Sequence, residues 1–221
     1  MSIGTSGLGH AQGRYAMGKQ NTGEFIDQII HTTASDGKSI CIRSIRSSDA
    51  EQMREGIAHL STQSRYLRFF SLQPMPSDSV IARLVDADGH DHIAWGAIHL
   101  DGADNPAIGA VHAIRSTDEQ RSGEFSVAIL DDYHGIGLGR MLTAVLLINC
   151  CAEQLQVLDI QTLAENHAAI GFIRSIGGEL KQWDGGVQDY VLEVKPAIAK
   201  LRETSDLQGI RDIFKALDQY L

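Results

Sequence analysis

The stretch from Glu124 to Arg140 holds the residues whose types and spacing indicate chemistry. A strand-like run ends in a turn containing Gly135, Gly137 and Gly139, and the turn opens an apolar segment with helical periodicity. The first amides of a helix have no partners within the helix and lie at its positive end. Glycines let a phosphate approach that backbone. The pattern therefore predicts a site for a di- or polyphosphate.

Two common phosphate-binding motifs do not fit this turn. A dinucleotide-binding fingerprint needs GxGxxG in the first strand–helix unit, whereas the spacing here is GxGxG, deep in the chain. A Walker loop needs Gly-Lys followed by Ser or Thr, which this turn lacks. From the glycines alone, a tight turn with a helix cap and no ligand remains an alternative.

The composition is that of an ordinary globular protein. The chain has 221 residues, of which 43% are hydrophobic and 21% charged, which favours one domain with appendages and excludes a disordered chain or a coiled-coil rod. With 19 basic and 28 acidic residues, the net charge is −9, so nucleic acid is not an expected partner. We find no apolar run near the ~20 residues of a membrane span and no signal-peptide pattern. A cytoplasmic location and no membrane partner are expected.

The cysteines and histidines give no prediction of a metal site. Cys41, Cys150 and Cys151 lack a CxxC pattern and are expected to be reduced core thiols. His90 and His92 share a strand face, but no third ligand lies nearby in the sequence, so a solvated strand entry is the favoured interpretation.

The elements that must position the phosphate turn form a mixed α/β order. Short links between the central strands predict antiparallel neighbours. Alternating patterns predict strands at 39–45, 92–100, 107–115, 124–130, 157–163, 179–183 and 187–194. Helical patterns cover 49–70, 77–85, 137–154, 166–176 and a tail from Pro196.

Three regions are expected along the chain. Residues 1–37 are predicted to be a flexible leader with a short helix, 38–195 the main domain, and 196–221 a C-terminal helical extension. The apolar face of the extension is expected either to pack on the main domain or to form a homodimer contact. The short helix would carry Phe25, Ile26, Ile29 and Ile30, and the face of the extension Leu207, Ile210, Phe214, Leu217 and Leu221.

Three segments, in order, resemble a known family. The segment from His134 to Arg140 resembles the (Gln/Arg)-x-x-Gly-x-(Gly/Ala) signature of the GNAT acyltransferase superfamily, and Ala164-Glu-Asn-His-Ala-Ala169 with Gly177 is similar to its Asn-x-x-Ala…Gly helix. The segments 42–49 and 60–70 resemble the GNAT domain of Pat-type protein lysine acetyltransferases. The resemblance covers roughly residues 38–180.

The resemblance implies both a fold and an activity. The fold would be the α+β GNAT acyl-CoA N-acyltransferase fold, a mixed, mostly antiparallel sheet flanked by helices. The activity would be transfer of an acetyl group from acetyl-CoA to an amine by direct attack, with a protein lysine as the favoured acceptor. A small-amine acetyltransferase and a non-catalytic acyl-CoA-binding regulatory module are the alternatives.

The resemblance also assigns roles to residues. Glu124 would be the general base, and the backbone of Val127, Ala128 and Ile129 would bind the pantetheine arm, with one amide polarising the thioester carbonyl. The other expected cofactor-binding residues are His134, Gly135, Ile136, Gly137, Leu138, Gly139, Arg140 and Asn166.

Some positions depart from the family pattern or allow two interpretations. His134 replaces the usual Gln or Arg, and Ile173 stands where many members carry a Tyr general acid. Tyr66 and Arg68 are interpreted either as part of the acceptor pocket or as packing beside the following phenylalanines.

Overall fold

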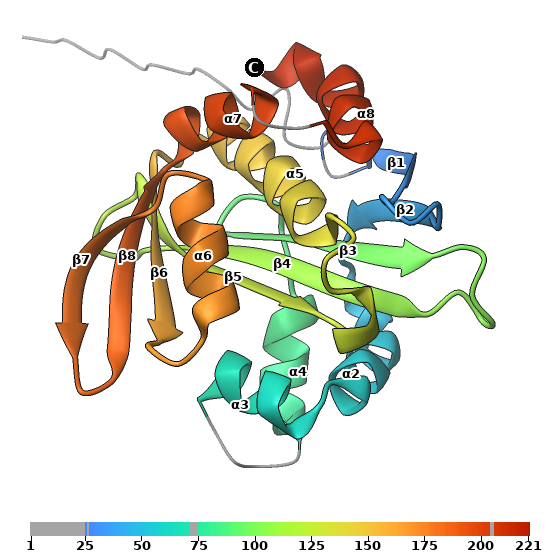
Figure 1. Cartoon of the computed structure of the whole chain (residues 1–221), viewed down its shortest axis with the longest axis horizontal. Helices are drawn as coiled ribbons and strands as arrows, with labels where there is room; N and C mark the ends of the chain where they lie inside the picture. Colours follow the sequence, from blue (N-terminus) through green and yellow to red (C-terminus); the bar gives the residue numbers. More distant parts are fainter. Residues whose placement is uncertain (1–24, 26, 71–74, 204–205) are drawn as a thin grey trace, which may run out of the picture.

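A single eight-stranded sheet forms the centre of the computed structural model, which describes residues 25, 27–70, 75–203 and 206–221 (Figure 1). The strand order is β1-β2-β3-β4-β5-β6-β8-β7, and every pair is antiparallel except the parallel pair β5–β6. The mixed, mostly antiparallel sheet is thereby confirmed. The strands are β1 (Ile29–Thr33), β2 (Ser39–Ser44), β3 (His92–His99), β4 (Ala107–Arg115), β5 (Ser122–Ile129), β6 (Val157–Leu163), β7 (Glu179–Asp184) and β8 (Val187–Glu193).

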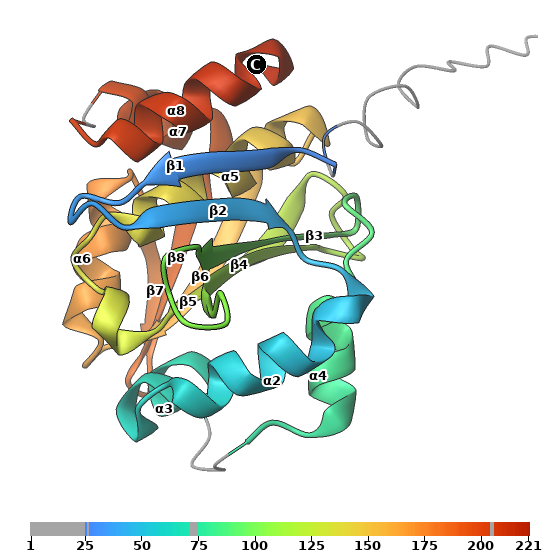
Figure 2. The same cartoon turned by 90° about the vertical axis from the view of Figure 1, so that its right-hand side faces the viewer.

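Helices cover both faces of the sheet (Figures 1 and 2). One face carries α5 (Leu138–Ala152), α6 (His167–Ser175), α7 (Val194–Glu203) and α8 (Gln208–Leu217). The other carries α2 (Ala50–His59), α3 (Thr62–Phe69) and α4 (Asp78–Val85). Short 3₁₀ helices are found at η1 (Ser47–Asp49), η2 (Asp131–Tyr133) and η3 (Asp218–Tyr220). Within the described part of the chain, no helix is long and apolar enough to cross a membrane.

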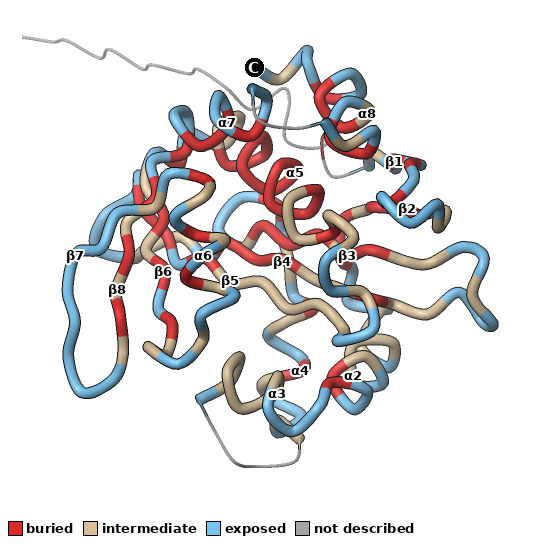
Figure 3. Tube along the Cα trace, viewed as in Figure 1, coloured by how far each residue is buried: buried red, intermediate tan, exposed pale blue. Residues whose placement is uncertain are grey.

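Helix α5 runs through the centre of the hydrophobic core. Every residue from Met141 to Cys150 is buried, because the sheet lies on one side of the helix and α7 and α8 on the other (Figure 3). A helix that is apolar all round requires such enclosure. The buried amide of Asn149 accepts a hydrogen bond from Trp95 Nε1 at 3.1 Å. This packing fixes the N-terminus of α5, where the glycine turn lies.

The prediction of a short helix around residues 25–30 is wrong for its C-terminal half. Ile29 and Ile30 begin the edge strand β1, which pairs with β2. The segment alternates, with Ile30 and Thr32 buried and Ile29 53% exposed, and its β-branched residues favour a strand. A run of a few apolar residues fits both the helical and the strand periodicity, and here pairing with β2 selects the strand. Within the leader predicted for residues 1–37, residues 1–24 and 26 lie outside the described residues.

The apolar face of the C-terminal extension packs on its own chain. Ile210, Phe214 and Leu217 are buried against α5 and β1. Asp212 also accepts a hydrogen bond from Thr32 Oγ1 at 2.8 Å. Of the two expectations for this face, the structure shows the contact within the chain.

Candidate active site

The sheet opens between its two parallel strands. β5 and β6 pair over only three positions, from Ser122 with Val157 to Glu124 with Asp159. Beyond this point β5 stays paired with β4 as far as Ile129. The C-terminal half of β5 therefore presents one edge of its backbone to the gap beside β6.

Strand alternation decides which amides face the gap. Leu130 N–H donates to Ile108 C=O at 3.0 Å, so residues with even numbers direct their backbone groups toward β4. Ala128 is thus held in the ladder, whereas Val127 and Ile129 direct their backbone groups into the gap. The carbonyl of Ile129 accepts a hydrogen bond there from His134 Nε2 at 3.0 Å.

The glycine turn joins this gap to the N-terminus of α5. Gly135 and Gly137 have φ angles of 77° and 87°, which side chains disfavour. The first bond of the helix runs from Met141 N–H to Gly137 C=O, so the amides before Met141 have no partner within the helix. Ile136 C=O accepts from Ser35 N–H at 3.1 Å, which ties the turn to the β1–β2 connection.

A cleft of about 820 Å³ runs from this turn along the gap to α3. Its walls come from β5, β6, α3, α6 and the start of α5. All of the predicted site residues except Glu124 and Ile136 line it. Those that do are Val127, Ala128, Ile129, His134, Gly135, Gly137, Leu138, Gly139, Arg140 and Asn166.

The carboxylate of Glu124 lies outside the lining of the cleft. The residue is exposed and forms the last pair before β5 and β6 separate. Because side chains alternate along a strand, Glu124 shares a sheet face with Ser126, which does line the cleft. Two residues of strand separate them by ~7 Å along the chain.

Two of the predicted cofactor-binding residues also form hydrogen bonds that stabilise helix ends. Arg140 Nη2 donates to Ser175 Oγ at 3.0 Å and so joins α5 to α6. Asn166 Oδ1 accepts from Ala169 N–H at 3.1 Å and caps α6. Ile173, in place of a tyrosine, is buried and offers no proton to the cleft.

Of the two residues considered for the acceptor pocket, Arg68 lines the cleft, at its far end from the glycine turn, and Tyr66 does not. The polar partners of Arg68 were not found by sequence reasoning. Arg68 on α3 donates from Nη2 to Ser126 Oγ on β5 at 2.8 Å. Burial lowers the pKa of the Arg68 guanidinium to about 10, so it is charged at neutral pH. Ser126 is in register with His112 on β4, whose Nδ1 lies 3.1 Å from Nε2 of His92. Burial, then the charges of Arg68 and His92, hold the pKa of His112 well below its usual value.

Helix α3 is anchored beside the glycine turn through Asp131 in η2. The Asp131 carboxylate accepts from Ser61 N–H at 3.0 Å and from the hydroxyls of Ser61 and Ser64 at 2.9 and 2.7 Å. Partial burial acts to raise the pKa of Asp131, but these hydrogen bonds and the charge of His134 lower it overall. One carboxylate thus fixes the helix that carries Arg68.

Comparison with known proteins identifies the arrangement. Residues 39–179 match the family model described as "Acetyltransferase (GNAT) domain". The chain belongs to this family. It is 24% identical over 176 residues to acetyltransferase Pat of Mycolicibacterium smegmatis, covering 80% of this chain and 52% of Pat. It is 31% identical over 108 residues to an acetyltransferase of Pseudomonas aeruginosa, covering 48% of this chain and 57% of that protein. The chain spans about half the length of these curated relatives.

Solved structures confirm the GNAT fold. The GNAT domain of S. lividans PAT superposes with a TM-score of 0.68 at 20% identity, covering 75% of this chain and 96% of that one. Spermidine N-acetyltransferase of Vibrio cholerae, solved with CoA and spermine, gives a TM-score of 0.56 at 16% identity, covering 72% of this chain and 98% of that one. At these identities the likeness establishes the fold alone.

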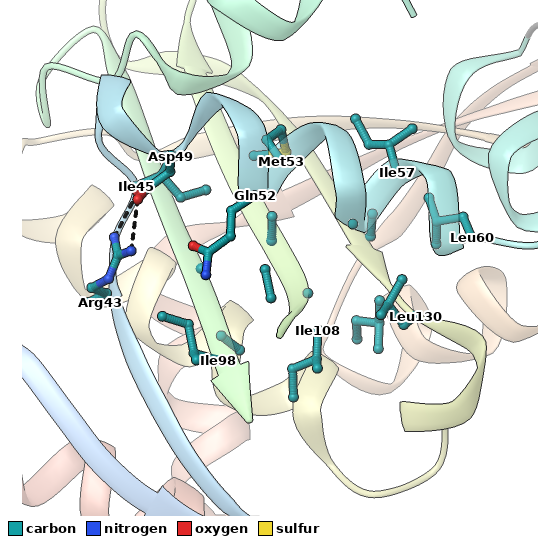
Figure 4. A pocket seen from close by; sticks show the side chains of 18 residues that line it. Arg43, Ile45, Asp49, Gln52, Met53, Ile57, Leu60, Ile98, Ile108 and Leu130 are labelled. Atoms are coloured by element: carbon teal, nitrogen blue, oxygen red, sulfur yellow. Dashed lines mark hydrogen bonds and ion pairs between the residues drawn. The ribbon is translucent and has the colours of Figure 1, made fainter. Parts of the chain in front are cut away.

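The GNAT domain has a second, apolar cavity of about 70 Å³ between α2 and the sheet (Figure 4). It exists because Gly96, Ala110 and Ala128 lie in register on three adjacent strands and leave space under the helix. The Arg43–Asp49 ion pair, at 2.7 Å, lies at one end of it. Leu60, Ala128 and Ile129 line both this cavity and the cleft.

The cysteines of this GNAT domain, and the histidines His90 and His92, lie away from the cleft lining. Cys41 and Cys150 are buried and Cys151 is partly buried, and all three are free thiols. His90 Nδ1 lies 2.6 Å from a Glu153 carboxylate oxygen. Within the described residues, no group of three or more His, Cys, Asp or Glu side chains is placed to hold a metal ion.

Proposed function

We propose that this GNAT domain transfers the acetyl group of acetyl-CoA to an amine, with a protein lysine as the favoured acceptor. The observation that carries the proposal is the gap between β5 and β6, which leads directly to the glycine turn at the N-terminus of α5. A helix N-terminus with free amides suits a pyrophosphate, and an unpaired strand edge suits an amide-bearing arm.

Each part of the cleft then has a role in the transfer. The turn from His134 to Arg140 would bind the pyrophosphate, and the backbone of Val127 and Ile129 would bind the pantetheine arm. An amide directed at the thioester oxygen would stabilise the charge that develops there, an effect of ~3–4 kcal/mol in other enzymes.

The amine must lose a proton before its nitrogen attacks. Glu124 is the proposed general base because its carboxylate shares a face with Ser126 at the point where the strands separate. Because Glu124 lies beside the cleft lining and not in it, it would take the proton of an amine in the cleft through a water molecule.

The choice of a protein lysine as acceptor rests on resemblance more than on the geometry of the cleft. Similarity to Pat-type enzymes supports a protein lysine. The shared fold with spermidine N-acetyltransferase leaves a small amine as the second candidate.

Binding of acetyl-CoA at the glycine turn is tested by a charge at Gly135. Its φ is positive, which Asp and Asn tolerate better than other side chains, and nothing lies within 4 Å of a Cβ added there. Gly137 is a poorer choice, because an added Cβ would lie 2.5 Å from Leu207 Cδ1. Gly135→Asp places a carboxylate beside the pyrophosphate, and Gly135→Asn is its neutral match.

The expected result is a thermal shift that depends on charge. Saturating acetyl-CoA at about 100 times its Kd should stabilise the parent by ~2.7 kcal/mol, a Tm rise of roughly 5–10 °C for a domain of this size. Gly135→Asn should retain most of the rise, and Gly135→Asp should weaken binding about tenfold or more. Equal shifts in the two variants would contradict the assignment of the turn.

A further inference from the structure

Arg68 lines the cleft and carries a charge at neutral pH. Its Nη2 bonds to the neutral hydroxyl of Ser126, and its guanidinium lies 5.0 Å from the ring centre of Phe69. Among the described residues, no carboxylate forms an ion pair with Arg68. Burying a guanidinium without an anion is costly, and its lowered pKa reflects that cost.

The surroundings keep this end of the cleft positive. His112 directs Nδ1 at His92, and its low pKa keeps it neutral beside Arg68. The only carboxylate that lines the cleft in the described residues is Asp206, at the glycine turn. Among the described residues, no carboxylate is paired with Arg68 or lines its end of the cleft, and a bound anion would balance its charge.

The position of Arg68 separates it from the phosphate site. Its partner Ser126 lies four residues before Leu130, where β5 has ended. At ~3.3 Å per residue, this places the guanidinium contact about 13 Å along the strand from the start of the turn region. The anion that Arg68 fits is accordingly not a phosphate on the glycine turn but a group at the reacting end of the cleft.

We propose that Arg68 binds a carboxylate carried by a substrate next to the reacting centre. The carboxylate belongs either to the acceptor, as an amine with a carboxylate close to its nitrogen, or to the acyl donor, as a dicarboxylic acyl-CoA. Arginine suits this ligand because its planar fork matches a carboxylate. The inference rests on the proposed function, acyl transfer to an amine in this cleft. A carboxylate on the acceptor would select the small-amine alternative, and a carboxylate on the donor would replace acetyl by a dicarboxylic acyl group with the lysine acceptor kept. A polyamine fits poorly, since its further ammonium groups would approach Arg68.

Two matched ligand pairs distinguish the sources by binding alone. The acyl pair is succinyl-CoA and butyryl-CoA, which have the same chain length and differ in the terminal carboxylate. The acceptor pair is an α-amino acid and its carboxamide, titrated against the CoA-bound protein. Calorimetry on the parent, Arg68→Gln and Arg68→Lys gives the affinity ratio within each pair. Arg65→Gln is the control, because Arg65 lies on the same helix but donates to Ala58 C=O.

The expected result is a preference for the charged member of one pair. A hydrogen bond to a charged group supports a preference of about 10- to 100-fold in the parent. Arg68→Gln, which removes the charge but keeps a polar side chain, should reduce the ratio to near one. Arg68→Lys should keep part of it, and Arg65→Gln should leave it unchanged. The pair that responds identifies the source.

Two results would overturn the inference: no preference in the parent within either pair, or a preference that Arg68→Gln leaves intact. Thermal melting of each variant without ligand shows whether α3 remains folded. Turnover of acetyl-CoA is measured separately, so a loss of the proposed function and a failure of the Arg68 assignment give different outcomes.

Discussion

The buried histidine beneath Arg68 makes the folding stability depend on pH in a specific window. His112 is 3% exposed and its pKa in the folded protein lies well below the usual 6.5. The unfolded chain therefore takes up this proton first as the pH falls. Stability is complete above about pH 6.5 and is lost below it, down to the folded pKa.

The magnitude follows from linkage. Each pH unit between the usual pKa of 6.5 and the lower folded pKa costs about 1.4 kcal/mol. The free energy of unfolding should therefore fall by about that amount for each pH unit below about 6.5, until the folded pKa of His112 is reached. The carboxylates with lowered pKa values, such as Asp49 and Asp131, lose their stabilising effect mainly below their usual pKa of 3.8, well below the pH at which the histidine effect begins. His112 thus dominates the change predicted from the resolved pKa shifts.

The assay is urea unfolding at about pH 7.5, 6.5, 5.5 and 4.5. His112→Gln keeps a group that can hydrogen bond to His92 but removes the titration, so its stability should be nearly flat across the window. His59→Gln is the control, because His59 lies exposed at the end of α2. If the parent and His112→Gln lose stability with the same slope, the reasoning from burial is refuted.

Three further predictions concern packing. Ala110→Val, which fills the cavity under α2, should raise the free energy of unfolding by up to about 1 kcal/mol. Ala113→Val, on the packed face of β4, should lower it by about 1–3 kcal/mol. Urea unfolding of both variants measures the difference. Deleting 206–221 should lower the Tm, because the apolar face of α8 packs on its own chain. Light scattering should show a monomer both before and after the deletion; a dimeric parent that becomes a folded monomer would contradict this. Asp131→Ala should speed amide hydrogen exchange in α3, and unchanged protection there would mean that Asp131 does not anchor the helix.

Sequence periodicity was sufficient for most elements near the cleft. The strand before the glycine turn and the helix after it have clear patterns, since one face or the whole element is buried. It failed at Ile29 and Ile30, where a short segment fits two periods and only pairing with β2 selects the strand.

Long-range contacts explain what the sequence could not show. Arg68 and Ser126 are 58 residues apart, and Asp131 lies 70 residues after Ser61. No local pattern links such residues; the sheet register and the docking of α3 bring them together. The gap beside β5 could not be predicted from the sequence either, because the point where two strands separate depends on the twist of the sheet and on the helices packed against it.

The central claim is that this cleft catalyses acyl transfer, and a thiol-release assay tests it most directly. The assay uses acetyl-CoA with protein, peptide and small-amine acceptors, comparing the parent with Glu124→Gln and with Glu179→Gln, an exposed carboxylate on β7. We predict turnover in the parent and in Glu179→Gln. In Glu124→Gln the rate should fall by about 10²–10⁴-fold, with an unchanged acetyl-CoA melting shift. Equal rates in all three proteins would remove Glu124 as the base. No turnover with any acceptor, despite a clear melting shift, would contradict catalysis and favour a regulatory acyl-CoA-binding module.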